Sequence, residues 1–488
     1  MVFTKISTFE KTIFFLLVSV VLYSFFSIEF NRIYYRDSLW IAAFAYNFAL
    51  EGSLYDVISR EPGLAIGHGR IHDYIYGNFM LFFNDYFYSH RTLSWIISIG
   101  VLIIFFSILK NLKFSNLQAL LSTLLLSLSE HFLLSSHIAR PEILVLLFVF
   151  FSLYLITYSK RFNLNFFIAG FLISLSIDIH LSSQISLFMI LFYEISNLKK
   201  AYSPRDYIYE VFKKYSFFIY GYLLGLFIVA INNFQYLNEI QNAMSFATQV
   251  SIETSIYDRL SWIFTFGLSS KYFRWMIFPF ILIMALIIFI SNPKKNLDPT
   301  FFIFLGGLFG LIILGRMNHH YLLIFFPFLY AYFISNLLNN KNVFSFISIF
   351  TLSSYFIFIQ FILFSNDAKA NPKMFYEKVR SAIEIPSDVI IIAPDNFWYS
   401  FKDREFYSYQ ARVNLKELAS KNKVIFISNE VFDLYYKENK VVGKNTGVRN
   451  INKNFLDGFE EILSFEDYHF GSFGLKKNNT ITFYQNFK

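Results

Sequence analysis

Long apolar runs separated by short polar segments make up the first three quarters of the chain. The first begins after Lys11, and similar runs recur until about residue 364, where the pattern ends. Each run approaches the roughly 20 residues that an α-helix needs to cross a bilayer. The pattern predicts about 11 membrane-spanning helices, at 12–30, 92–109, 117–134, 141–158, 164–181, 183–198, 215–231, 275–291, 300–315, 320–338 and 343–364.

Basic residues mark every second connection between these runs. Clustered positive charge beside a span predicts the cytoplasmic side. Two proposed spans separate each cluster from the next, so all clusters fall on one side. We therefore expect a multi-pass protein of the cytoplasmic (inner) membrane, with its N-terminus inside and its C-terminus outside. The clusters are Lys5/Lys11, Lys110/Lys113, Lys160/Arg161, Lys199/Lys200 through Lys213/Lys214, Lys294/Lys295 and Lys341.

Composition agrees that lipid is the solvent for most of the chain. Of 488 residues, 55% are hydrophobic and only 16% are charged, so membrane lipids are expected partners. The formal charge of +8 is divided among short clusters between spans, which argues against nucleic acid as a partner. The first run lacks a small-residue cleavage site, which favours a retained signal-anchor helix. The absence of cysteine excludes disulfides and thiolate chemistry.

The segment after the last run has a different pattern. Short apolar stretches at 388–394 and 423–428 and the late "TITFYQN" predict strands, while 373–384 and 412–421 predict helices. These elements indicate a small extracytoplasmic (periplasmic) α/β domain at 366–488, following a transmembrane domain at 1–365. It contains no Gly-rich phosphate loop and no nucleophile elbow, so we interpret it as a lid or an acceptor-docking module.

Histidine and arginine are concentrated on the predicted outer face. All nine histidines map to outer loops, outer helix ends or the C-terminal segment. The outer basic residues are nearly all arginine, whose planar fork suits phosphate or carboxylate. Ionisable groups so near a bilayer are costly, so their concentration predicts a functional site. The candidates are the catalytic acids Asp37 and Asp73, the phosphate-binding arginines Arg36, Arg91, Arg140 and Arg316, and also His72, Glu142, Asp178, His180, His319, His320 and Tyr321.

Each candidate also has a structural interpretation. Asp37 precedes an amphipathic stretch, "AAFAYNFALEG", that ends at Gly52, so an N-cap role is open. The acids and histidines of the first loop could be solvated, and Arg140 and Glu142 could be a simple surface pair. Two histidines and a carboxylate could bind Mn²⁺, Mg²⁺ or Zn²⁺, but tight ligand spacing is absent. No cofactor is certain, and the metal stays unassigned.

A polyprenyl-phosphate-linked sugar suits such a surface. Its tail lies in lipid, its phosphate needs cations, and its sugar projects into water. A carboxylate can take the proton of an acceptor hydroxyl as that hydroxyl attacks the anomeric carbon. Arginines or a metal ion can stabilise the departing phosphate. The expected donor is a polyprenyl-phosphate sugar, and the acceptor is a lipid, a glycan or a protein.

At these residues the sequence resembles the GT-C superfamily of membrane glycosyltransferases, particularly its protein O-mannosyltransferase and aminoarabinose-transferase-like branch. The resemblance covers about residues 10–365 and departs from the family at Ser38 and at His72–Asp73, where many members carry a glutamate and a double proline. It implies a dolichyl- or undecaprenyl-phosphate-dependent hexosyl- or pentosyltransferase of inverting type, with Asp37 as general base. The motifs are "RDSLW", "AYNFALEG", "HRTLSW", "ARPE", "IDIHLS" and "HHYLLIFFP".

Two other functions remain open. A transporter or flippase of lipid-linked glycans should carry charged residues deep within its spans, whereas here the charges lie at outer ends. A polymerase or ligase of lipid-linked glycans usually has its largest outer loop late in the chain, whereas here a long loop follows the first span. Both comparisons favour the transferase.

Overall fold

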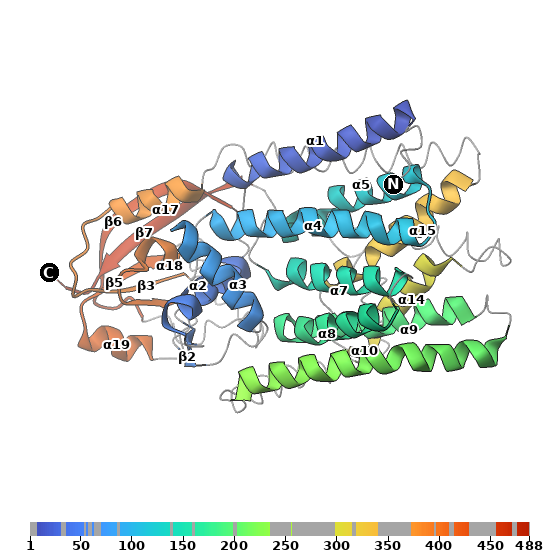
Figure 1. The fold of residues 1–488 in the computed structure, drawn as a ribbon. Helices are drawn as coiled ribbons and strands as arrows, with labels where there is room; N and C mark the ends of the chain where they lie inside the picture. Colours follow the sequence, from blue (N-terminus) through green and yellow to red (C-terminus); the bar gives the residue numbers. More distant parts are fainter. Residues whose placement is uncertain are drawn as a thin grey trace. The chain divides into compact units, whose positions relative to one another are not determined.

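The protein is described by a computed structural model (Figure 1). Two compact units divide the chain. Unit 1 consists of Met1–Phe25, Gly67–His72 and Leu93–Phe361, and unit 2 consists of Phe26–Ile66, Asp73–Thr92 and Ile362–Lys488. The structure describes residues 7–30, 36–52, 55–56, 61–62, 70–84, 88–136, 140–158, 162–198, 203–234, 255, 298–314, 319–339, 372–394, 397–408, 414–428, 455–470 and 476–487.

Unit 1 is a bundle of helices that run alongside one another (Figure 1). Among its described residues, three helices are long and apolar enough to cross a membrane, and several shorter apolar helices accompany them. Together with the fold, this apolar surface is that of an integral membrane protein. The helices are α1 (Thr8–Phe30), α4 (Ser89–Asn111), α5 (Asn116–Leu128), α6 (Glu130–Ser136), α7 (Pro141–Thr157), α8 (Phe162–Ile179), α9 (Ile185–Leu198), α10 (Pro204–Asn233), α14 (Pro299–Leu314) and α15 (Phe326–Asn339).

Most predicted spans coincide with these helices, although three are interrupted or shortened. The run at 117–134 breaks at Ser129, where α5 ends and α6 begins. The run at 320–338 starts as the 3-10 helix η4 (His319–Ile324) before α15. Helix α8 ends before His180, which starts the 3-10 helix η1 (Leu181–Gln184). The predicted spans 275–291 and 343–364 lie outside the described residues.

Glycines allow two helix pairs of unit 1 to pack backbone against backbone. On α10, a Cβ at Gly221 would overlap the carbonyl oxygen of Phe167 on α8, and one at Gly225 would overlap the Ser174 hydroxyl. On α14, a Cβ at Gly306 would meet the carbonyl oxygen of Phe188 on α9. Small residues four apart permit such close approach in membranes, where apolar side chains gain little by associating. These contacts hold α10 against α8 and α14 against α9.

Unit 2 joins the first loop of the chain to its C-terminal segment. Helix α2 (Arg36–Glu51) ends at Gly52, whose φ of 65° suits glycine, as the sequence predicts. Its Tyr46 ring lies 6.4 Å from that of Trp398 on α18 (Trp398–Phe401), and Lys402 lies over Tyr46. The unit therefore contains chain from both sides of the boundary predicted near residue 365. The first loop also contributes the short strands β1 (Tyr55–Asp56) and β2 (Glu61–Pro62) and, from Asp73 onward, the helix α3 (Arg70–Phe83).

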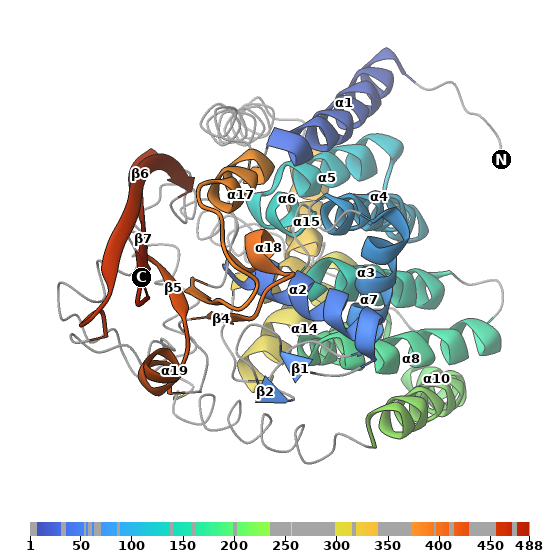
Figure 2. The ribbon, with the colours of Figure 1, turned by 90° about the vertical axis from the view of Figure 1, so that its left-hand side faces the viewer.

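A five-stranded sheet with strand order β4-β3-β5-β7-β6 forms the core of the C-terminal segment (Figure 2). The parallel strands β3 and β5 coincide with two predicted strands, and β7 contains all but the last residue of the predicted "TITFYQN". The sheet buries Ile392 and Phe426 against helix α19 (Leu415–Lys421). Its strands are β3 (Ile390–Ala393), β4 (Phe406–Ser408), β5 (Val424–Ser428), β6 (Glu460–Phe470) and β7 (Lys476–Gln485), and its other helices are α17 (Pro372–Ser381) and α19 (Leu415–Lys421).

Candidate functional site

Several predicted site residues meet where the helices of unit 1 end. The 3-10 helix η1 packs against α7, α8 and α14, and η4 packs against α6, α7 and α15. The start of α7, the end of α8 and both 3-10 helices therefore lie at one end of the bundle. The sequence assigns all these helix ends to a single side of the membrane, and the bundle brings them together. Which side that is stays a prediction.

Arg140 and Glu142 form a buried ion pair at the start of α7. The Nη2 atom of Arg140 lies 2.6 Å from Oε1 of Glu142, and its Nε donates to both carboxylate oxygens at 3.2 and 3.0 Å. Arg140 is the residue before the helix, and Pro141 occupies the first turn, as the sequence predicts. Both side chains are almost fully buried, which distinguishes the pair from a surface contact. Glu142 therefore fixes the orientation of the guanidinium group.

Asp178, in the last turn of α8, joins three parts of the chain. Its Oδ2 accepts a 3.0 Å hydrogen bond from the backbone N–H of Ile71, and its Oδ1 accepts one of 2.7 Å from Nδ2 of Asn233. Arg70 adds electrostatic attraction to the carboxylate. The carboxylate thus binds the start of α3, the end of α8 and the end of α10 together.

His180 and Tyr321 link the two 3-10 helices of unit 1. His180 is the N-cap of η1, because its Nδ1 accepts from the backbone N–H of Ser182 at 3.1 Å. Its Nε2 lies 3.5 Å from the Tyr321 hydroxyl, with ring centroids 5.2 Å apart. Both residues are buried. A contact between residues 141 positions apart shows that the two predicted candidates belong to one cluster.

The candidates of the first loop and of α4 are buried rather than solvated. His72 and Asp73 lie in the first turn of α3 and are fully buried. Arg91 lies in the first turn of α4 and is 1% exposed. Fully buried side chains are not solvated, so the solvated-loop interpretation of His72 and Asp73 is wrong.

For four other predicted candidates the structure describes the backbone alone. Arg36 and Asp37 occupy the first turn of α2, so Asp37 is the second residue of the helix rather than the residue before it. Their side chains, and those of His319 and His320 in η4, lie outside the described residues. Arg316 lies outside them altogether.

No set of three metal-ligating side chains comes together within the described part of the chain. Asp178 and His180 are close in sequence, yet the Asp178 oxygens bond Ile71 and Asn233 while the His180 Nδ1 faces Ser182. The divalent cation suggested by the sequence therefore stays a prediction.

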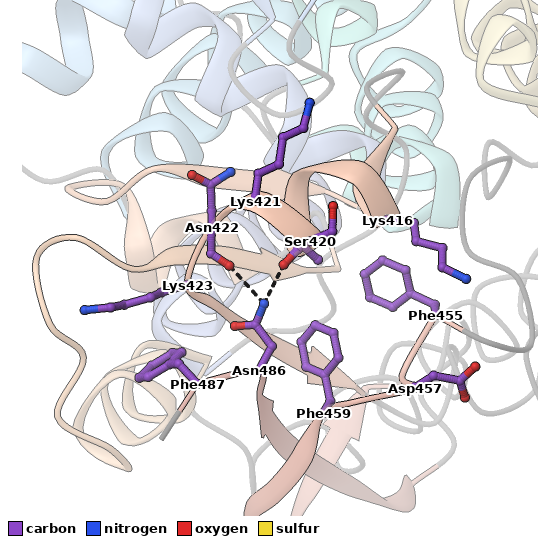
Figure 3. Close-up of a pocket in the computed structure, with 11 residues that line it drawn as sticks. Lys416, Ser420, Lys421, Asn422, Lys423, Phe455, Asp457, Phe459, Asn486 and Phe487 are labelled. Carbon is purple, nitrogen blue, oxygen red and sulfur yellow. Dashed lines mark hydrogen bonds between the residues drawn. The ribbon is translucent and has the colours of Figure 1, made fainter.

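A cavity of about 480 Å³ lies in unit 2, beside α19 and the turn before β6 (Figure 3). Nδ2 of Asn486 bonds the carbonyl oxygens of Ala419 and Asn422 at 2.6 and 2.9 Å, which ties the C-terminal strand to α19. Lys423 points away from the cavity and bonds Asp388 at 2.8 Å, and this bond lowers the pKa of the Asp388 carboxyl. None of the predicted site residues lines this cavity.

Sequence reasoning missed Asn233 and the backbone of Ile71. A polar "NN" pair directly after the apolar run of α10 was the available signal for Asn233. A backbone N–H leaves no trace in a sequence, so its bond to Asp178 required the tertiary structure.

No family model matches the chain, and no curated protein matches it in sequence. Solved structures do match it in fold. The crystal structure of ArnT from Cupriavidus metallidurans in the apo state gives a TM-score of 0.58 at 9% identity, covering 96% of this chain and 97% of that chain. The chain has the fold of ArnT. The crystal structure of ArnT bound to undecaprenyl phosphate gives a TM-score of 0.57 at 8% identity, with the same coverage.

The similarity to ArnT extends over both units, including the C-terminal segment that the sequence motifs did not cover. It confirms the fold that those motifs implied. Because identity is below a tenth, the shared property is the course of the backbone, and the chemistry must be argued from this chain's own residues.

Proposed function

We propose that this protein is a membrane glycosyltransferase that moves a sugar from a polyprenyl-phosphate donor to an acceptor on the outer face of the cytoplasmic membrane. The observation that carries the proposal is the ArnT fold over 96% of the chain, since one ArnT structure is bound to undecaprenyl phosphate. The acceptor is a lipid, a glycan or a protein.

The cluster at the helix ends of unit 1 supports this proposal independently. A buried arginine held in a fixed orientation by Glu142 stands at the start of α7. The two 3-10 helices that His180 and Tyr321 link pack against α7. Arginine binds phosphate through a planar array of donors, and a fixed orientation lowers the entropy lost on binding. This arrangement suits a lipid phosphate that arrives from the membrane.

The proposed reaction assigns one role to each group. Asp37 is the general base that takes the proton from the acceptor hydroxyl as the hydroxyl attacks the anomeric carbon. The bond from that carbon to the phosphate breaks, and Arg36, Arg91, Arg140 and Arg316 stabilise the departing phosphate. Attack from the face opposite the phosphate inverts the anomeric centre. Asp73 is a second candidate acid.

Purified full-length protein in detergent should consume one member of a panel of polyprenyl-phosphate sugars. Release of polyprenyl phosphate is the measurement, and Asp37→Asn protein is the matched control. If no donor in a panel of hexoses and pentoses were consumed with lipid, glycan or peptide acceptors, the glycosyltransferase proposal would fail. Consumption with water alone would identify a hydrolase instead.

The proposed orientation has its own test. Reporter fusions at Ser53 and Asn429 should both report export, and a fusion at Lys200 should report the cytoplasm. Cytoplasmic reporter activity at Asn429 would contradict the outer location of the C-terminal segment.

A further inference from the structure

The first turn of helix α3 has backbone N–H groups that no carbonyl group of the same helix can accept. The first four N–H groups of any α-helix have no carbonyl partner within the helix. Ile71 is the second residue of α3, so its N–H is one of these four. Capping usually comes from the residue just before the helix. Here the acceptor comes from Asp178, a residue 107 positions away on α8.

The geometry at Asp178 is that of a helix cap supplied by another helix. One carboxylate oxygen accepts from the Ile71 N–H at 3.0 Å, and the other accepts from Asn233 Nδ2 at 2.7 Å. Asn233 is itself held to α10 by a 2.8 Å bond from Nδ2 to the Val229 carbonyl oxygen. Negative charge is also favourable at a helix N-terminus. Both oxygens of Asp178 therefore have structural partners.

We propose that Asp178 is a positioning residue that caps α3 and thereby fixes the two residues after Ile71, His72 and Asp73, for the reaction. The carboxylate acts through α3 and does not exchange protons with the substrate. The link to activity rests on the proposed glycosyltransferase function, but the capping itself does not. The first turn of α3 is thus held by a carboxylate that α8 supplies.

Two substitutions separate this role from acid–base chemistry. Asp178→Asn keeps one oxygen that can accept from the Ile71 N–H, but it removes the charge and any basic function. Asp178→Ala removes both acceptors. Ser176→Ala is the matched control, because the Ser176 hydroxyl bonds only the Ile173 carbonyl oxygen of its own helix among the described residues.

Hydrogen exchange of the peptide that contains Ile71, measured by mass spectrometry on full-length protein in detergent, reports the cap directly. Loss of a hydrogen bond to a charged acceptor should speed this exchange roughly tenfold to a hundredfold in Asp178→Ala. Asp178→Asn and Ser176→Ala should remain within a few-fold of the parent. Unchanged exchange in folded Asp178→Ala would overturn the capping role.

Activity on the donor identified for the parent gives the second readout. Turnover should fall in Asp178→Ala and largely persist in Asp178→Asn, in step with the exchange of Ile71. Asp178→Asn protein that shows normal exchange but no turnover would overturn the proposal in favour of a catalytic carboxylate.

If Asp178→Ala does not fold, Asn233→Ala takes its place. Unaltered Ile71 exchange in that variant would contradict the junction of α3, α8 and α10 at Asp178. Failure of every donor in the parent would reject the transferase function while leaving the exchange result valid.

Discussion

The Tyr321 hydroxyl lies 3.5 Å from Nε2 of His180, and the opposite ring nitrogen of His180 caps the 3-10 helix η1. One imidazole therefore has two separable roles. Its Nδ1 accepts a backbone hydrogen bond that stabilises a helix start, whereas its Nε2 faces the aromatic residue of a different 3-10 helix.

Substitution of His180 should separate these roles. An asparagine side chain at this position places an oxygen where Nδ1 stands and retains the cap, whereas an alanine side chain offers no acceptor. His180→Ala should therefore destabilise the protein by about 1 kcal/mol more than His180→Asn. Both variants lose the contact with Tyr321. Thermal unfolding in detergent measures the first effect, and donor turnover measures the second. If both variants, His180→Asn and Tyr321→Phe, turn over donor as fast as the parent, the contact between His180 and Tyr321 has only a structural role.

If the arginines bind the donor phosphate, even their replacement by lysine should weaken phosphate binding. Arg91→Lys and Arg140→Lys keep the charge but lose the planar fork, so each should weaken binding of undecaprenyl phosphate by roughly tenfold or more. Direct binding to purified protein is the measurement. Arg205→Lys is the control, since Arg205 is exposed at the predicted cytoplasmic start of α10. Parent-like affinity in both test variants would return these arginines to a structural role.

Helix packing through glycine predicts a large cost for a single methyl group. In Gly221→Ala the new Cβ would overlap the Phe167 carbonyl oxygen, and backbone cannot rotate away as a side chain can. We expect the free energy of unfolding to fall by about 1–3 kcal/mol, which a lower unfolding temperature would report. In Gly100→Ala the Cβ would meet only the flexible Leu147 Cδ1 at 3.3 Å, so this control should unfold like the parent or later. A tolerated Gly221→Ala would mean that α8 and α10 pack less closely.

Asp37→Asn tests the proposed base. Asparagine has nearly the same size as aspartate and loses only a modest interaction of the charge with the start of α2, so insertion and expression should be normal. Donor binding should also persist, because the arginines remain. Loss of a general base should lower turnover about 10²- to 10⁴-fold. Turnover equal to that of the parent would show that Asp37 only supports the start of α2.

Local pattern determined the elements of this protein. The length and hydropathy of each apolar run specify a helix whatever surrounds it, because a backbone in lipid must satisfy its own hydrogen bonds. Short apolar stretches rich in β-branched residues likewise specified β3 and β5, and the late "TITFYQN" specified β7. Gly52 could be recognised as a helix end, since only its positive φ matters there. The ordered motifs at the helix ends carried a resemblance, and the fold that it implied agrees with that of ArnT.

Tertiary structure decided which polar residues act together. Arg140 and Glu142 stand two positions apart, and only their burial distinguishes a fixed ion pair from a surface contact. The capping of α3 by Asp178 joins residues 107 positions apart through a backbone N–H that no side-chain pattern records. The breaks after Ser129 and before Phe326 leave the apolar pattern almost unchanged, because hydropathy does not register the path of the backbone. Sequence thus determines which groups lie at the helix ends, whereas long-range packing selects their partners.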